Sequence, residues 1–472
     1  MKRYIVILSA IVIAGLIAGC GGGVEQAQPR RSVPGISEPS SMSESAGKAT
    51  VNEITFQGWQ AVELTNGLVT VVAVPEIGGR IMDYRIEGQT LLWVNPAEAG
   101  SKYTAAGDES QRRFHDFGGM RVFPAPVEDW DGPADPVGSS LTGGNWTHEI
   151  LSRRGRKVEV ELKSPADKAH TGLQITRTLR LYADTTHLQV VETFENVGDR
   201  TVNWAIQSAA QSPAGAATEG EEAAADSAKA YLPLNPDSAH KRRFVYFSES
   251  GLRQFEPIDD NALLEITYQG REGFIGADSM EGWVAYVNGP SNYALVQRFS
   301  PNKLENYPNE GSTVTVKTSK SPAYLQTELS SPIYEIVPGD SVQNTIDCYV
   351  TQVQGPVRDT TQTAAIVEPI TVTKQEDTFK VTGKLGPFAP GRLLVYLKDK
   401  DGNLIGEQIK TDAMVGKMIE LNAELKAEKL GTQVVVELEN PQGSPLGEVF
   451  AMDVSAKLAK EEPGETEEKK TE

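Results

Sequence analysis

Residues 64–96, LTNGLVTVVAVPEIGGRIMDYRIEGQTLLWVNP, decide the fold class. Their first third is rich in β-branched residues in partial alternation, which predicts a strand. The pair Gly78-Gly79 then interrupts the pattern, and strand-like sequence resumes until a turn at Glu87-Gly88. Glycines within strand sequence usually mark a bulge or a close approach of two backbones. A second interpretation is that the bulge directs Arg80 into a ligand cleft, where its guanidinium would donate hydrogen bonds.

Strand signals continue along the chain, for example in VEVELK, LQITRTLRLYA, HLQVVETFENVG and STVTVKTS, while helical periodicity is scarce. Many short strands separated by turns predict an all-β protein of sandwich architecture. We expect a large domain over residues 49–355. A second domain is expected over 366–455, where about seven strands match the size of an immunoglobulin-like β-sandwich. Its DKDGN stretch at 399–403 lacks the spacing of a calcium loop and predicts a hairpin turn instead.

The N-terminus predicts export and lipid attachment. Lys2 and Arg3 precede a compact apolar segment that ends in Ile17-Ala18-Gly19-Cys20. This pattern is typical of a secretory signal, here over residues 1–20, and the apolar run is shorter than the about 20 residues of a membrane span. The last four residues resemble the lipobox of bacterial lipoproteins, in which the cysteine is lipidated. Gly21 after Cys20 favours the outer membrane in a Gram-negative cell, by the same resemblance.

Composition limits the classes of function. A length of 472 residues suggests two or three domains. The net charge of −19 argues against nucleic-acid binding, which requires a basic face. Residues 21–48 are rich in Gly, Ser and Pro and read as a flexible tether, and 456–472 read as a disordered charged tail. With Cys20 lipidated, Cys348 has no cysteine partner and is expected to be a buried small side chain.

Tryptophans gather near loops rich in Gly and Pro, at Trp93, Trp130 and Trp146. Indole rings stack on the apolar faces of sugars, while Arg, Asn and carboxylates bind the hydroxyls. The alternative for each tryptophan is packing in the sandwich core. Neither a cluster with zinc-ligand spacing nor a G-x-S-x-G nucleophile motif occurs, so we expect no metal and no cofactor.

Several of these segments together resemble the galactose mutarotase-like superfamily, which includes aldose 1-epimerases and hexose-6-phosphate mutarotases. The likeness covers roughly residues 50–350 and is nearest to an uncharacterised branch found in bacterial secreted proteins and lipoproteins. It implies a large antiparallel supersandwich with a sugar-binding cleft across one sheet. The segments that carry it are PEIGGRI, LLWVNP, FGGMRVFPAP, ETFENVGDRTVNWAIQS and YLQTELSSPIYEIVPGDS.

The resemblance also implies site residues. Glu328 matches the late glutamate that acts as the catalytic base in the family. Phe117 stands where the hexose-phosphate members have an Arg before the Gly-Gly pair, which makes a phosphorylated sugar a poorer fit. The residues expected to contact a sugar are Arg80, Trp93, Asn95, Arg121, Trp130, Trp146 and Gln207.

One departure from the family weighs against catalysis. Mutarotases pair their base with a histidine acid on the central strand. Here that region reads NWAIQSAAQS, and neither Gln207 nor Gln211 can transfer a proton at neutral pH. His115 or His148 would have to substitute, unless both are ordinary loop residues.

Three functions therefore remain. The first is a lipid-tethered carbohydrate-binding protein without standard mutarotase activity, which we favour. The second is an active aldose 1-epimerase-like enzyme with Glu328 as base. The third is an envelope protein that binds a protein partner through its C-terminal sandwich.

Overall fold

A computed structural model describes residues 47–102, 115–129, 140–215, 227–248, 252–303, 305–426 and 431–455. All of these residues belong to one compact unit that spans 39–472. The predicted signal segment, all but the last two residues of the tether, the charged tail and Trp130 lie outside the described residues. No helix in the described ranges is both long enough and apolar enough to cross a membrane.

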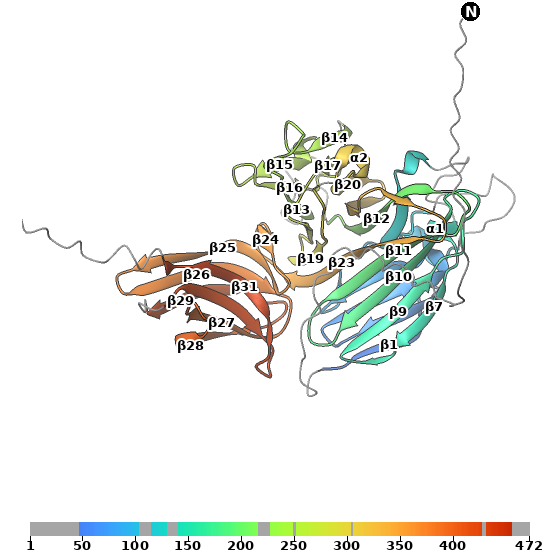
Figure 1. Cartoon of the computed structure of the whole chain (residues 1–472). Helices are drawn as coiled ribbons and strands as arrows, with labels where there is room; N and C mark the ends of the chain where they lie inside the picture. The colour runs from blue at the N-terminus through green and yellow to red at the C-terminus, as the bar shows by residue number, and fades with distance from the viewer. Residues whose placement is uncertain are drawn as a thin grey trace, which may run out of the picture. The chain divides into compact units, whose positions relative to one another are not determined.

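The larger part of the molecule is built from two antiparallel sheets (Figure 1). The first sheet has 13 strands, and β22 and β5 pair with β12 and β4 beside its main path. In spatial order it contains β14 (Val245–Ser248), β17 (Gly273–Ala277), β20 (Val314–Lys320), β21 (Ala323–Ser330), β12 (Val202–Pro213), β6 (Met120–Ala125), β4 (Arg80–Ile86), β3 (Val69–Val74), β2 (Trp59–Thr65), β1 (Ala49–Phe56) and β8 (Arg154–Gly155), with β22 (Tyr334–Ile336) and β5 (Gln89–Thr90).

The second sheet has 10 strands. In spatial order these are β15 (Phe255–Ile258), β16 (Leu263–Thr267), β13 (Lys229–Pro233), β18 (Trp283–Val287), β19 (Tyr293–Arg298), β23 (Ser341–Gln352), β11 (Leu188–Asn196), β10 (Leu173–Tyr182), β9 (Lys157–Lys163) and β7 (Thr147–Ser152). The only α-helices in the described ranges are the single turns α1 (Ser140–Gly143) and α2 (Pro308–Gly311). The prediction of an all-β protein with large antiparallel sheets is confirmed.

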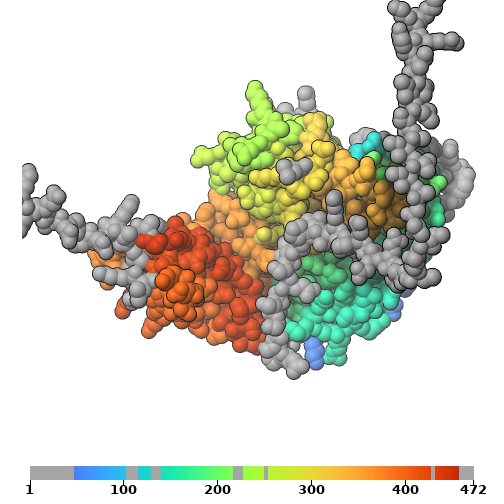
Figure 2. Space-filling view, viewed as in Figure 1, coloured from blue at the N-terminus to red at the C-terminus, as the bar shows by residue number. Residues whose placement is uncertain are grey.

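The core lies between these two sheets because each strand alternates its side chains. On β10, Leu173, Ile175, Arg177, Leu179 and Leu181 are buried, and the residues that alternate with them are half-buried. The four apolar side chains join a cluster that includes residues from both sheets, such as Val122 of β6. The opposite side of β9 and β10 forms part of the teal and green surface in Figure 2. Period-two burial of this kind is what the sequence pattern predicts.

One inward position on β10 carries a charge instead of an apolar side chain. Arg177 is fully buried and forms an ion pair of 3.0 Å with the fully buried Glu192 of β11. Its Nη1 donates to the carbonyls of Gly79, at 2.9 Å, and Met120, at 3.0 Å, which belong to the first sheet and its loops. Ser208 of β12 donates to Glu192 at 3.0 Å. This network therefore links the two sheets through polar contacts within the apolar core.

Of the two roles predicted for the glycine pair of the opening stretch, the close approach of two backbones is found and the bulge is not. Pro75–Ile77 form a short 3-10 turn after β3, and Gly78 and Gly79 follow with φ of 82° and 60°. They close the β3–β4 hairpin, whereas the bulge in its ladder lies further along β4, beside Met82. A Cβ on Gly78 would lie 2.2 Å from the Thr142 carbonyl oxygen, and one on Gly79 would lie 2.5 Å from the Trp146 ring. Both left-handed backbone angles and close packing therefore require glycine here.

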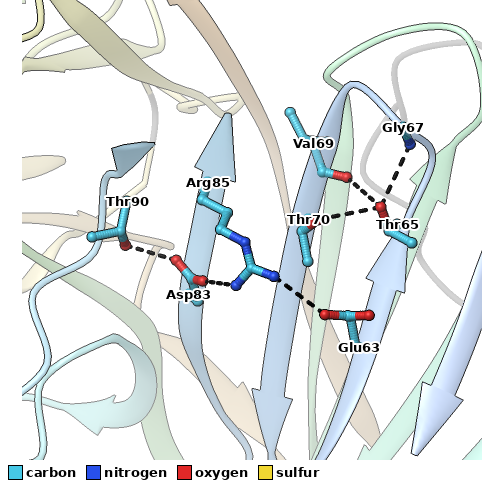
Figure 3. Close-up of polar contacts among 8 residues, drawn as sticks. All are labelled: Glu63, Thr65, Gly67, Val69, Thr70, Asp83, Arg85 and Thr90. Atoms are coloured by element: carbon cyan, nitrogen blue, oxygen red, sulfur yellow. Dashed lines mark hydrogen bonds and ion pairs between the residues drawn. The ribbon is translucent and has the colours of Figure 1, made fainter. Parts of the chain in front are cut away.

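Beside this hairpin, a polar chain runs across the face of β2, β3 and β4 (Figure 3). Arg85 lies between two carboxylates and forms ion pairs with Asp83 and, at 3.3 Å, with Glu63. Thr90 of β5 donates to Asp83 at 2.7 Å. One guanidinium thus bridges two carboxylates of this sheet face, one on β4 and one on β2.

The C-terminal strands form a smaller β-sandwich with its own apolar cluster, which includes Phe379, Val395 and Val436. Residues 399–403 join two of its strands, and Asp399 accepts from the backbone of Asp401 and Asn403, as the predicted hairpin turn requires. The described residues contain no group of side chains that could hold a metal ion. One sheet contains β24 (Asp359–Thr360), β25 (Ala364–Gln375), β26 (Thr378–Pro387) and β29 (Ile419–Lys426), and the other contains β28 (Leu404–Ala413), β27 (Gly391–Lys398), β30 (Gln433–Glu439) and β31 (Pro445–Asp453).

Candidate functional site

Four neighbouring strands of the first sheet, β6, β12, β21 and β20, carry polar side chains on the face away from the core. On β12, Trp204, Ile206 and Ala210 join the core cluster, so Gln207 and Gln211 point to the opposite side. We call the polar side of these four strands the polar face. Its side chains at the centre are buried although they do not belong to the apolar core.

The strand register places a small residue between two charges. Ala209 of β12 is opposite Arg121 of β6 on one side and opposite Glu328 of β21 on the other. Glu328 is in turn opposite Thr315 of β20. Residues in register across adjacent strands point to the same side of a sheet. Arg121 and Glu328 therefore flank an alanine floor.

The Glu328 carboxylate is held by neutral donors. Its Oε2 accepts from Gln207 Nε2 at 2.5 Å and from Thr315 Oγ1 at 2.6 Å, and its Oε1 accepts from Gln326 Nε2. None of these three partners exchanges a proton at neutral pH. The arrangement stabilises an acceptor but supplies no acid beside it.

Arg121 has the opposite character, because its guanidinium lacks acceptors. The residue is 9% exposed, and its Nε and Nη1 are buried without a hydrogen-bond partner. Its guanidinium carbon lies 5.2 Å from the centre of the Phe123 ring, a cation–π contact that provides no acceptor for these N–H groups. A buried donor without an acceptor is costly, and such groups often mark a place where a ligand or water binds.

A second polar row runs beside the first. Gln211 of β12 is opposite Gln326 of β21, and its Nε2 donates to Asp116 Oδ1 at 3.0 Å. The Oε1 atoms of both glutamines are buried without a partner. Asn95 donates to the Asp116 carbonyl at 2.8 Å and so holds the loop that carries Asp116. The polar face thus offers both unpaired donors and unpaired acceptors.

Two aromatic rings border these polar groups. Trp93 and Tyr324 lie with ring centres 5.1 Å apart and tilted by 36°. The Trp93 backbone is fixed to β12, because its N–H donates to the Gln211 carbonyl at 2.8 Å. Burial, assisted by the charge of Asp116, raises the pKa of Tyr324 to about 12, so its phenol is neutral at physiological pH.

Five of the predicted site residues therefore come together, namely Trp93, Asn95, Arg121, Gln207 and Glu328. Gln207 and Gln211 lie in the region where the family has its histidine acid. Of these two glutamines, Gln207 is the one that contacts Glu328. Sequence reasoning missed Tyr324 and Gln326, although both precede Glu328 at even spacing on a strand, which puts them on its face. Thr315 and Asp116 carried no such signal, because they depend on strand register and on loop geometry.

Arg80 and Trp146 occupy structural positions instead of the predicted contacts with a ligand. Arg80 is fully buried, and it donates to the carbonyls of Gly118, at 3.0 Å, and Thr142, at 3.4 Å. Trp146 is 2% exposed, donates to the Leu141 carbonyl at 3.1 Å and belongs to the core cluster. Close packing around the glycine pair explains both placements. Arg80 secures the loops next to the polar face, and Trp146 fills the space that the glycines leave.

The two histidines considered as acids have other partners. His115 Nδ1 lies 2.8 Å from Glu98 Oε2, and its ring stacks on Phe117 with centres 5.2 Å apart. His148 Nε2 lies 3.4 Å from Oε1 of Glu53 on β1. Phe117 itself is buried in an apolar cluster with Trp59, so this position contributes no phosphate ligand.

Comparison with solved structures gives matches over about two thirds of this chain. A galactose mutarotase-like protein from Clostridium acetobutylicum is 11% identical and matches with a TM-score of 0.42, over 64% of this chain and 98% of that one. A putative aldose 1-epimerase from Escherichia coli is 10% identical, with a TM-score of 0.40 over 65% of this chain and 100% of the other. The Slr1438 protein from Synechocystis is 12% identical, with a TM-score of 0.41 over 64% and 100%.

No protein-family model matches this chain. No curated protein matches it either.

Proposed function

We propose that the polar face binds a carbohydrate. The observation that carries the proposal is the set of buried, unpartnered polar atoms on Arg121, Gln211 and Gln326 beside the Trp93–Tyr324 pair. Sugars present hydroxyls that both donate and accept, together with apolar ring faces that stack on aromatics. A ligand of this kind would satisfy the donors and acceptors that the protein leaves unpaired.

In this proposal, the protein binds the sugar but does not catalyse the exchange of its anomers. Two side-chain amides and a hydroxyl orient Glu328. The side chain of β12 that contacts it is the amide of Gln207. A mutarotase needs a second group that delivers a proton to the ring oxygen while the base removes one. In the described residues no acid contacts Glu328, so we propose that it accepts hydrogen bonds from sugar hydroxyls.

Saturation-transfer NMR of the full chain in detergent, with a panel of neutral and acidic hexoses, tests this function. We expect transfer to bound sugars, with α/β anomer exchange no faster than in buffer. Gln326→Leu should weaken the transfer, whereas Gln174→Leu, the same change on the outer side of β10, should not. Absence of transfer across the panel would refute sugar binding.

The second candidate, an aldose 1-epimerase, is favoured by the position of Glu328 on the polar face. The same NMR samples distinguish it from a binding protein. Accelerated anomer exchange that disappears in Glu328→Gln, with folding retained, would establish catalysis and overturn the non-catalytic proposal.

We also propose that the chain is a lipoprotein anchored through Cys20. The support is the order of charged, apolar and small residues before that cysteine. A single lipid-modified terminus followed by residues 21–48 would hold the folded part near a membrane surface, with the outer membrane as the proposed location in a Gram-negative cell.

A further inference from the structure

The arginines near the polar face are not matched by carboxylates. Within the described ranges, neither Arg80 nor Arg121 forms an ion pair, and Arg177 is paired only with Glu192 in the core. The carboxylate of Glu328 lies on the far side of Ala209 and is occupied by three neutral donors. Asp116 is the nearby carboxylate whose charge favours the protonated form of Arg80. Its Oδ1 accepts a hydrogen bond from Gln211. Among the described residues, the two arginines Arg80 and Arg121 thus stand against the single carboxylate of Asp116 on this side of the face.

Both burial and the neighbouring arginines act on Arg80. Burial, together with the charges of Arg121 and Arg177, lowers the pKa of Arg80 to about 9. Buried positive charges that repel each other are destabilising unless an anion compensates them. An anionic ligand at Arg121 would relieve this repulsion as well as satisfying the unpartnered N–H groups.

The shape of a guanidinium specifies the anion further. Its planar N–H groups match a carboxylate with two parallel hydrogen bonds, and charge-assisted bonds in a buried site are the strong ones. The remaining groups of the face, namely the free glutamine oxygens and the Trp93–Tyr324 pair, suit a sugar ring and its hydroxyls. The neighbouring guanidinium of Arg80 lies over the Phe117 ring and donates to the carbonyls of Gly118 and Thr142, so it is already committed within the fold.

We propose that the ligand of the polar face is an acidic sugar, a hexuronate or a glycan that ends in one, whose carboxylate binds Arg121. This inference rests on the proposed sugar-binding function and adds the charge of the ligand to it. In this arrangement the carboxylate lies on the Arg121 side of the Ala209 floor, and the hydroxyls point toward Glu328 and Gln326.

The test compares sugars that differ at one carbon. Titration calorimetry of the full chain in detergent would use galacturonate, galactose and the methyl ester of galacturonate, and the corresponding glucose series. We expect the uronate of one series to bind about tenfold or more tightly than its neutral counterparts. In Arg121→Gln this preference should fall to about twofold or less, because the uronate loses much more affinity than the neutral sugar does. Arg180→Gln, an equal change of charge on the outer side of β10, should keep the preference.

Two failures have different meanings. If neutral sugars bind as tightly as uronates, or if the preference survives in Arg121→Gln, the assignment of the carboxylate is wrong while sugar binding stands. Tighter binding of galactose 6-sulfate than of galacturonate would also overturn it. If none of the sugars binds, both the proposed function and this inference fail. Should Arg121→Gln not fold, the ester comparison on the unaltered chain still decides the charge.

Discussion

Arg121 and Glu328 stand on the same face of the first sheet, and the strand between them places Ala209 opposite both. A larger side chain at this position would project between the two charged groups. The neighbouring residue, Ala210, points into the core instead. These adjacent alanines therefore allow the same substitution to be tested on the two sides of one strand.

Ala209→Val should reduce the affinity for sugar about tenfold or more, because the added methyl groups occupy the floor of the site. Its thermal midpoint should fall less than that of Ala210→Val, because Ala209 lies outside the apolar core cluster. Ala210→Val should instead destabilise the protein by about 1–3 kcal/mol through overpacking, with affinity retained in the folded fraction. Calorimetric titration and thermal unfolding measure the two effects. Equal behaviour of the two variants would contradict the assignment of the faces.

Substitution of Trp93 and of Trp146, the two tryptophans within the described residues that were considered for sugar stacking, should have different effects: one on sugar affinity and the other on stability. Trp146→Ala should lower the free energy of unfolding by about 3–5 kcal/mol, because Trp146 fills a buried space against Gly79. Trp93→Ala should mainly weaken sugar binding, since Trp93 is half-buried and borders the polar face. Urea unfolding and ligand titration of both variants provide the comparison. A stability loss confined to Trp93→Ala would reverse the two roles.

The buried pair Arg177–Glu192 should make stability depend on pH. Burial raises the pKa of Glu192 to about 7, although the charge of Arg177 and the hydrogen bond from Ser208 act to lower it. A carboxyl with a raised pKa in the folded state stabilises fully below its unfolded pKa of about 4.3, and this contribution is lost as pH rises through about 7.

Glu192→Gln should therefore remove this loss of stability between pH 4.5 and 8, although the variant is less stable overall because Arg177 keeps a buried charge without its partner. Chemical denaturation of both proteins at several pH values measures the difference in slope. Parallel pH profiles would show that Glu192 does not titrate in this range.

Cys20→Ser should abolish attachment of lipid and release the protein into the soluble fraction of an expressing bacterium. The prediction follows from the lipobox-like sequence, in which the thiol is the acylated group. Metabolic labelling with a palmitate analogue and detergent phase partitioning measure it. Cys348→Ser is the matched control, because Cys348 is buried in the core and should not affect labelling. Label retained in Cys20→Ser would refute the anchor.

The sequence could predict features that depend on one segment of the chain, but not those that depend on contacts between distant segments. Strand alternation identified the all-β architecture, and the resemblance pointed to Glu328 and Gln207, which do contact each other. Thr315 was missed because it reaches Glu328 only through the register of β20 on β21. Arg80 was assigned to a ligand because a sequence does not show whether a guanidinium meets a sugar or two loop carbonyls. Trp146 was ambiguous for the same reason.

The buried Arg177 has a consequence for inherited variation. It holds the carbonyls of Gly79 and Met120, the residues directly before Arg80 and Arg121. Both guanidiniums beside the polar face thus take their position from a side chain of the opposite sheet. With the ligand bound as proposed, mutations along β10 and β11 would shift ligand preference in a lineage while each residue on the polar face stays the same. Relatives that differ in specificity should be compared at positions 177 and 192 as well as on the binding face itself.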